Sequence, residues 1–369
     1  MKKMLYIMNV DWNWIKQRPQ FLAEGLAKKY DLDVIYRYKY NRKGLTKDKF
    51  RKQFTLTPIY TIPFINNKYL KKINSWIVNQ VIKKKINTMN PDFIYLTNPE
   101  QIQAIPNNCK SIIIYDCMDY HHAFLNDLSE SKKIISDELK LVKRADIILA
   151  SSQKLKDNLI NDYSLTKEIY VVRNGYNGKV LSESQIILPT ISTKLTKITY
   201  IGTISHWFDF DTLLKSLEDF PNIEYEIVGP ISKTTVPYHK RLKFLGSIPH
   251  EQLTDIVRDT DVLIMPFQVN DIVEAVDPVK LYEYINFNKN IISVRYDEVL
   301  RFSPFVHFYS DYTEYKRVLE QLICSSSLTY SLSQRYEFLE KNTWENRVQM
   351  IERILAVFDL GRDCNAREN

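Results

Sequence analysis

The chain has 369 residues, of which 44% are hydrophobic and 26% charged, and its formal net charge is +7. This length favours two domains, and the balance of apolar and charged residues excludes an intrinsically disordered chain. None of the eight glycines stands in the G-x-G-x-x-G or G-x-x-x-x-G-K-[ST] spacing, which disfavours a Walker-type nucleotidase and a standard dinucleotide-binding protein.

Strands and helices are predicted to alternate in the N-terminal half. Apolar, β-branched runs predict buried strands at 2–10, 32–38, 92–97, 111–117, 145–151 and 168–175. Helical spacing of apolar residues predicts helices at 18–30, 68–86, 136–146 and 152–160, with Pro19 in the first turn of the first one. Because strands separated by helices form parallel, doubly wound sheets, we expect a Rossmann-like α/β domain over residues 1–178.

A second alternating series follows a connector. Residues 176–196 are polar and contain Pro189, which is typical of a linker. Strand-like runs then occur at 197–202, 223–230, 242–248, 261–267 and 290–294, and helical spacing occurs at 210–220, 250–260 and 280–288. We therefore expect a second Rossmann-like domain over 179–342, followed by a helix at 343–360. Ligands of such sheets bind beyond the carboxyl ends of the strands.

Cysteine usage and apolar runs indicate the compartment. The four cysteines form no C-x-x-C pair and no zinc-like cluster with the six histidines. The start of the chain is too short in its apolar part for a secretory signal, and no apolar run approaches the roughly 18 residues of a spanning helix. We expect a cytoplasmic protein in a reducing compartment.

Positive charge is concentrated in the first quarter of the chain. Residues 1–90 carry a formal charge of +15, so the remainder carries −8. Basic residues with aromatic residues between them are concentrated in 37–54 and 68–85, a pattern that suits a membrane leaflet, a lipid pyrophosphate or nucleic acid. The alternative interpretation is a solvated, lysine-rich surface.

The most informative segment is DPVKLYEYINFNKNIISV, at residues 277–294. A helix that begins after Pro278 places Lys280 and Glu283 on one face. An ammonium group, a helix N-terminus and a carboxylate suit a nucleotide diphosphate, since Lys280 would neutralise the diphosphate and Glu283 would accept hydrogen bonds from ribose. The alternative is an ordinary amphipathic helix with an exposed ion pair.

The same segment resembles the donor-site helix of family 4 glycosyltransferases, which have the GT-B fold. Glu283 matches the second glutamate of the family's E-x7-E motif, whereas Ala275 stands where the first would fall. Residues 200–214 resemble the family's first strand, glycine loop and helix, and 244–267 resemble its block beside the nucleotide base. VVRNGYN at 171–177 resembles the run that ends the N-terminal domain.

Two N-terminal segments give a narrower resemblance. DWNWIKQRPQFLAEGLA at 11–27 and IYDCMDYHHAF at 114–124 resemble bacterial capsule and teichuronic-acid glycosyltransferases. The resemblance implies two Rossmann-like domains facing a central cleft, with the C-terminal helix returning to the N-terminal domain. It also implies a nucleotide-sugar donor that is bound by the C-terminal domain. The implied donor-binding residues are Gly202, Thr203, Gly246, Asp277, Lys280, Leu281 and Glu283.

The N-terminal loops supply the remaining candidate residues. Arg18 is placed for an anionic group and Trp12 for stacking on an acceptor sugar, although tryptophans are often buried in the core. Asp116 and Asp119 follow a buried strand, and sugar transfer requires a base or stabilisation of an oxocarbenium-like centre. We favour Asp119 as the base, then Asp116, with His121 behind them; the alternative is a cap or turn role.

A possible metal motif is better explained as a helix start. Asp209-Phe210-Asp211 matches the D-x-D of another glycosyltransferase fold, but here Asp209 is expected to be a helix N-cap. We expect neither a metal nor another cofactor.

The sequence thus predicts a metal-independent glycosyltransferase of bacterial cell-surface polysaccharide biosynthesis. Its partners would be a nucleotide sugar, a glycan or lipid-linked acceptor and the anionic inner face of the cell membrane, but not nucleic acid. Three alternatives remain at this point: a nucleotide-sugar epimerase of the same fold, a basic nucleic-acid-binding protein, and an inactive sugar-nucleotide binder.

Overall fold

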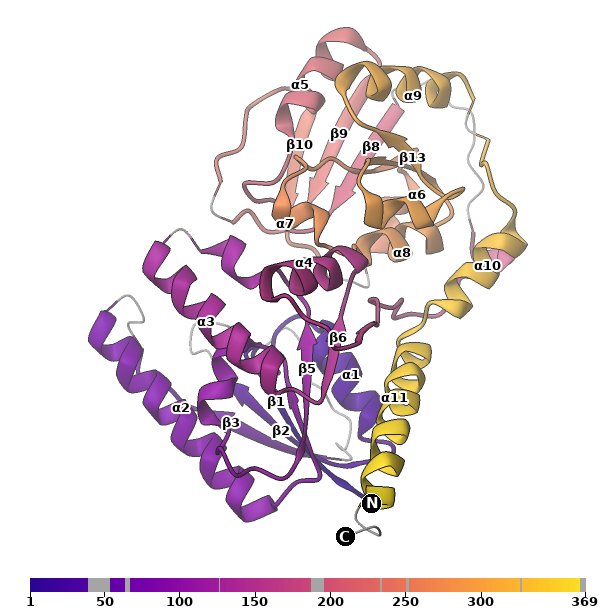
Figure 1. Ribbon diagram of the computed structural model, residues 1–369. Helices are drawn as coiled ribbons and strands as arrows, with labels where there is room; N and C mark the ends of the chain where they lie inside the picture. Colours follow the sequence, from indigo (N-terminus) through magenta and orange to yellow (C-terminus); the bar gives the residue numbers. More distant parts are fainter. Residues whose placement is uncertain are drawn as a thin grey trace. The chain divides into compact units, whose positions relative to one another are not determined.

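The computed structural model describes residues 1–38, 54–63, 67–125, 127–186, 196–232, 234–249, 252–325 and 327–365. The chain divides into two compact units (Figure 1). Unit 1 comprises Met1–Gly175 and Trp344–Asn369, and unit 2 comprises Tyr176–Thr343. The chain therefore passes from one unit to the other twice, after Gly175 and after Thr343, close to the predicted borders at 178 and 342.

Unit 1 contains a seven-stranded parallel sheet in the order β3-β2-β1-β4-β5-β6-β7. Its strands are β1 (Lys3–Met8), β2 (Asp31–Arg37), β3 (Thr55–Ile59), β4 (Phe93–Leu96), β5 (Ile112–Cys117), β6 (Ile147–Ala150) and β7 (Ile169–Val171). The strand order reverses between β1 and β4, which makes that point the topological switch of a doubly wound sheet. All six predicted strands are confirmed. The sequence analysis missed β3, a short edge strand that contains Pro58.

Helices cover both faces of this sheet (Figure 1). The α-helices are α1 (Arg18–Leu26), α2 (Lys68–Met89), α3 (Leu128–Arg144), α4 (Gln153–Tyr163) and α11 (Trp344–Asn365), and 3-10 turns occur at η1 (Pro99–Ala104) and η2 (His121–Phe124). Pro19 lies in the first turn of α1, as predicted. Trp344, Val348 and Ile351 of α11 join Leu22 of α1 and Tyr6 of β1 in one buried core. The C-terminal helix is therefore part of unit 1.

Unit 2 repeats the design with a six-stranded parallel sheet in the order β10-β9-β8-β11-β12-β13. Its strands are β8 (Thr196–Ile201), β9 (Ile223–Val228), β10 (Leu242–Gly246), β11 (Val262–Met265), β12 (Asn290–Val294) and β13 (His307–Tyr309). Its α-helices are α5 (Phe210–Asp219), α6 (Leu253–Arg258), α7 (Asp271–Glu274), α8 (Val279–Asn286), α9 (Tyr312–Cys324) and α10 (Leu332–Lys341), with 3-10 turns at η3 (Glu183–Gln185) and η5 (Asp297–Phe302). The switch point of this sheet lies between β8 and β11.

The predicted elements of unit 2 are confirmed, but its C-terminal part was missed. β13, α7, α9 and α10 were not predicted from the sequence. Among the residues that the structure describes, no helix combines the length and the apolar character needed to cross a bilayer.

Candidate active site

Lys280 lies above Gly202 at the switch point of unit 2. Gly202 follows β8 with φ +151°, a backbone conformation that L side chains rarely adopt. A Cβ atom at this position would overlap Lys280 Cε and stand 2.8 Å from Nζ. The Lys280 ammonium is 5.9 Å from the ring centroid of Tyr200 on β8 and 6.0 Å from that of Phe267, which follows β11. The absence of a side chain at Gly202 therefore leaves the space that the Lys280 side chain occupies near the ends of β8 and β11.

Among the residues that the structure describes, none forms an ion pair with Lys280. Its ammonium makes no hydrogen bond or ion pair with any described residue, and its side chain is half-buried. Burial lowers the pKa of Lys280 below the ordinary value of 10.5, and the nearby Glu283 only partly offsets this effect. A desolvated cation without a partner is costly, so an anionic ligand at this point would be stabilised strongly.

Tyr284 fixes the donor-site helix α8 to the same switch point. Strands β8 and β11 are paired only as far as Thr199 and Leu263, and they diverge beyond these residues. The Tyr284 hydroxyl accepts a hydrogen bond from Ile201 N–H at 2.8 Å and lies 3.4 Å from the Ile264 carbonyl oxygen. This buried hydroxyl replaces the missing strand pairing. The sequence analysis did not identify it, because nothing in the local pattern distinguishes Tyr284 from an ordinary core residue.

Two further glycines end the neighbouring strands. Gly229 follows β9 with φ +141°, and a Cβ atom there would overlap the carbonyl oxygen of Gly202. Its N–H donates to the Gly246 carbonyl oxygen at 2.8 Å. Gly246, which ends β10 at φ +71°, has open space where a Cβ atom would stand. Gly229 was not among the predicted residues, although a glycine directly after a buried strand was a visible signal.

The other predicted donor-site residues divide into accessible and buried ones. Glu283 lines a cavity of about 170 Å³ together with Tyr176, Thr254 and Asn286. Burial, reinforced by the Glu283 carboxylate, raises the pKa of Tyr176 to about 12. The carbonyl oxygen of Thr203 accepts a hydrogen bond from the Tyr200 hydroxyl at 2.8 Å, which shapes the loop after β8.

Two predicted donor contacts have structural partners instead. Asp277 is fully buried and forms an ion pair with Arg301, and it also accepts a hydrogen bond from the Tyr282 hydroxyl at 3.4 Å. The Leu281 side chain is part of the unit 2 core. For both residues, the expected side-chain contact with a donor is replaced by packing that holds the start of α8 in place.

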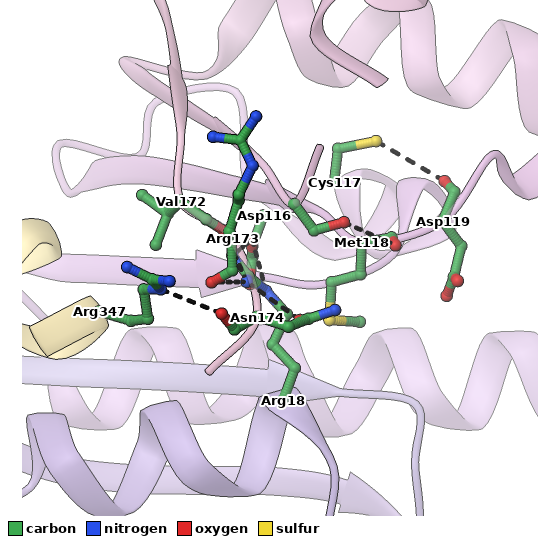
Figure 2. Close-up of polar contacts among 10 residues, drawn as sticks. Arg18, Asp116, Cys117, Met118, Asp119, Val172, Arg173, Asn174 and Arg347 are labelled. Carbon is green, nitrogen blue, oxygen red and sulfur yellow. Dashed lines mark hydrogen bonds and ion pairs between the residues drawn. The ribbon is translucent and has the colours of Figure 1, made fainter. Parts of the chain in front are cut away.

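In unit 1, the predicted anion-binding residue Arg18 is engaged with the predicted base Asp116 (Figure 2). Arg18 Nη2 donates to Asp116 Oδ1 at 2.7 Å, and Nε donates to Asp116 Oδ2 at 3.0 Å. The two side chains are 5% and 0% exposed. Although burial alone would lower the pKa of Arg18, the Asp116 carboxylate raises it above its ordinary value. This arrangement differs from both expected roles, because each charge is neutralised by the other.

Arg18 also fixes the segment through which the chain leaves unit 1. Its Nη1 donates to the Val172 carbonyl oxygen at 2.7 Å and to that of Arg173 at 3.2 Å. From α11, Arg347 Nε donates to the Asn174 carbonyl oxygen at 3.0 Å (Figure 2). The two arginines therefore hold residues 172–174 between α1 and α11.

The loop after β5 contains the remaining candidate bases. Asp119 is exposed, and Figure 2 shows its carboxylate pointing away from the Arg18–Asp116 pair. The loop is held by the Ser151 hydroxyl, which donates to the Met118 carbonyl oxygen at 3.0 Å, and by the Cys117 thiol, which donates to that of Asp119 at 3.7 Å. His121, in η2, has a buried Nε2 atom for which no described residue supplies a hydrogen bond. Asp119 and His121 thus remain candidates for the catalytic base, whereas Asp116 is buried on β5 in its ion pair with Arg18.

The structure assigns structural positions to Trp12 and Asp209, two further residues considered in the sequence analysis. Trp12 is 5% exposed and belongs to the unit 1 core, which favours the alternative interpretation over stacking on a sugar. Asp209 is the N-cap of α5, because its side chain accepts from Thr212 N–H at 3.2 Å, as predicted. Within the described ranges, no group of three or more His, Cys, Asp or Glu side chains is arranged to hold a metal ion.

Comparisons with known proteins agree with this architecture. No protein-family model matches the chain. Its sequence is 25% identical over 215 residues to TuaH of Bacillus subtilis (strain 168), a protein assigned as a teichuronic acid biosynthesis glycosyltransferase. That match covers 53% of this chain and 54% of TuaH, so it spans about half of the relative's length.

Solved structures are similar over nearly the whole chain. Sucrose-phosphate synthase from Thermosynechococcus elongatus has a TM-score of 0.72 at 12% identity, covering 98% of this chain and all of that one. Anabaena HepE in complex with UDP-glucose has a TM-score of 0.71 at 13% identity, covering 97% and 100%. Two doubly wound parallel units and these neighbours define the fold as GT-B, as predicted.

Proposed function

We propose that this protein is a glycosyltransferase that transfers a sugar from a nucleotide-diphosphate sugar to a glycan or lipid-linked acceptor in bacterial cell-surface polysaccharide biosynthesis. The observation that carries the proposal is the ammonium of Lys280 above Gly202 at the unit 2 switch point, which has no ion-pair partner in the described part of the chain. The likeness to TuaH and to a fold that holds UDP-glucose in HepE supports it.

The donor would be held mainly by charge and by backbone groups. Lys280 would neutralise the diphosphate, and the first turn of α8, which has no side-chain cap, would offer its N–H groups. The glycine after β8 would let the backbone approach the phosphates closely. Glu283 would accept hydrogen bonds from the ribose hydroxyls. Since Lys280 would supply the positive charge, no metal or other cofactor is part of the proposed reaction.

Asp119 is the proposed base for the acceptor hydroxyl, with His121 as the second candidate. A base must reach the hydroxyl whose proton it takes, and the exposure of the Asp119 carboxylate on a loop held by hydrogen bonds supports this choice. Asp119→Asn should lower turnover far more than it weakens donor binding, because the group acts in the transition state. Near-normal turnover of Asp119→Asn would show that Asp119 is not the base.

The proposed activity is tested by mass spectrometry of products from a panel of nucleotide sugars and membrane extract. Transfer predicts an acceptor that is heavier by one sugar, with turnover that survives EDTA and is lost in Lys280→Met. A nucleotide sugar that is isomerised without transfer would indicate an epimerase instead. Salt-sensitive RNA or DNA binding without sugar turnover would indicate a nucleic-acid-binding protein.

We also propose that unit 1 associates peripherally with the cytoplasmic face of the membrane. The exposed side of α2 carries Tyr69 (78% exposed), Ile73 (44%) and Trp76 (63%), with Lys72 and Lys84 on the same side. Interfacial helices combine aromatic groups with cations in this way, and each cation near an anionic leaflet contributes about 1 kcal/mol.

Vesicle sedimentation tests this association. Anionic vesicles should bind the protein more than neutral ones do, and salt should weaken the binding. Replacing Tyr69 and Trp76 with Ser should release it, whereas Tyr238→Ser, at an exposed aromatic residue of unit 2, should not. The basic set Arg42, Lys43, Lys47, Lys49, Arg51 and Lys52, which lies outside the described residues, should contribute in the same direction when changed to Gln. Equal sedimentation of all variants would contradict the proposal.

A further inference from the structure

A small cavity with both polar and apolar lining residues lies at the switch point of unit 1. It measures about 40 Å³ and is lined by residues at or near the ends of β1, β2 and β3, by α2 and by η1. Its apolar floor consists of Ile7, Ile35, Ile59 and Ile82. One water requires roughly 10–15 Å³ of such space, so the cavity has room for about three waters or one group of that size. This is the place in a doubly wound sheet where ligands bind.

Arg37 of β2 is one of two cationic residues that line this cavity, the other being Lys133. Asp33 of β2 forms an ion pair with Lys85 of α2, and alternate residues of a strand share a face, so Arg37 also lies on the face that α2 covers. Its guanidinium makes no hydrogen bond or ion pair with any residue that the structure describes. Five N–H donors are therefore available there.

The other groups around the cavity leave this charge uncompensated. Lys133 forms an ion pair with Glu100 at 2.8 Å, so these two lining charges neutralise each other. The side chains of Ser75 and Asn79 on α2 add neutral polar groups to the wall. The cavity therefore combines one positive charge with hydrogen-bonding groups in a space of oxyanion size.

We propose that Arg37 binds an anionic group of the acceptor, either the carboxylate of an acidic sugar or a phosphate of a lipid-linked carrier. Both are planar or tetrahedral oxyanions, which a guanidinium binds through two parallel hydrogen bonds. This inference rests on the proposed function, because it names the chemistry of the acceptor. It also assigns to Arg37 the anion-binding role that the sequence analysis gave to Arg18, whose charge is already neutralised by Asp116.

Direct binding tests the proposal without any assumption about turnover. Glucuronate and inorganic pyrophosphate are titrated calorimetrically into the wild type, Arg37→Gln, Arg37→Lys and the control Lys132→Gln, which removes an exposed charge next to Lys133. Arg37→Gln should lose about 10-fold or more in affinity for one of the two probes, and the probe affected distinguishes carboxylate from phosphate. Arg37→Lys should retain part of this affinity, and Lys132→Gln should retain all of it.

Kinetic measurements distinguish a failure of the proposed role of Arg37 from a failure of the proposed glycosyltransferase activity. For an anionic acceptor, Arg37→Gln should raise KM with little change in kcat, while UDP affinity and KM for a matched neutral acceptor stay unchanged. Equal losses for neutral and anionic acceptors, or unchanged affinity for both probes, would overturn the role of Arg37 and leave the glycosyltransferase intact. Probe binding that depends on Arg37 in a protein that turns over no nucleotide sugar would instead overturn the proposed function alone.

Discussion

Arg18 in unit 1 and Lys280 in unit 2 are both cations withdrawn from water near the carboxyl ends of strands in a doubly wound sheet. Arg18 is neutralised by Asp116 and has carbonyl partners at Val172 and Arg173. Lys280 has aromatic rings around it and no counter-ion among the described residues. Both were predicted to bind anions. Burial and position in the sheet are therefore not enough to distinguish a cation with a structural role from one that binds a ligand. The distinction depends on whether the protein itself supplies partners for the charge.

Breaking the satisfied pair should have the largest effect. Asp116→Asn keeps the shape but leaves the Arg18 charge uncompensated, so unit 1 should lose about 3–5 kcal/mol of stability. Replacing both residues, as Arg18→Met with Asp116→Leu, should cost less than either change alone. Urea unfolding followed by tryptophan fluorescence reports on unit 1, since four of the five tryptophans belong to it.

The matched control is the exposed ion pair between Lys71 and Glu130, which also joins two elements of unit 1. Glu130→Gln should change stability by at most about 1 kcal/mol, because water screens such a pair. If Asp116→Asn costs no more than Glu130→Gln, then Arg18 is not held by its partner and its distinction from Lys280 disappears.

The glycines that end strands β9 and β10 of unit 2 test the comparison through a smaller expected effect. Gly246→Ala should cost about 1–2 kcal/mol, because its φ is positive but the space is open. Gly229→Ala should cost more and should also weaken UDP binding, since its Cβ would displace the carbonyl of Gly202, the residue next to Lys280. Hydrogen exchange resolved by peptide measures the stability of unit 2 in both variants. If the two variants lost equal stability and equal UDP affinity, the position of the Gly202 loop would not matter for donor binding.

The pKa of Lys280 predicts a smaller, pH-dependent effect. Because burial lowers this pKa below 10.5, the Lys280 site binds more protons in the unfolded chain than in the folded one between the two values, and the stability of the wild type relative to Lys280→Met should rise with pH across that window. UDP affinity should fall there, by at most about tenfold per pH unit, as the ammonium loses its charge. Calorimetry of the wild type and of Lys280→Met across the alkaline range checks both trends, and Lys280→Met should lack the fall in UDP affinity.

Much of the fold could be predicted because buried parallel strands form continuous apolar runs. All six predicted strands of unit 1 are confirmed, as are the predicted elements of unit 2. The missed strand β3 contains alternating threonines and Pro58, a composition that is compatible with a strand only at a sheet edge. The edge strand β13, with three residues, is too short to give a pattern.

The candidate site was only partly predictable, because the role of each charged residue depends on side-chain partners that lie far away in the sequence. The motif at 277–294 predicted the helix that carries Lys280 and Glu283, which is α8, but it did not show that Asp277 pairs with Arg301, 24 residues away. Arg18 and Asp116 are 98 residues apart and were assigned separate roles. Their pairing depends on how β5 and α1 pack, which no local spacing encodes.

The central claim, that Lys280 is the cation for the donor diphosphate, is tested most directly by calorimetry with UDP and with uridine. The variant is Lys280→Met, and the control is Lys240→Met, at an exposed lysine just before the amino end of β10 and thus at the opposite edge of the sheet. We expect Lys280→Met to bind UDP about 10- to 100-fold more weakly and uridine with little change, and Lys240→Met to behave as wild type. UDP affinity that is unchanged in a folded Lys280→Met protein would contradict the account.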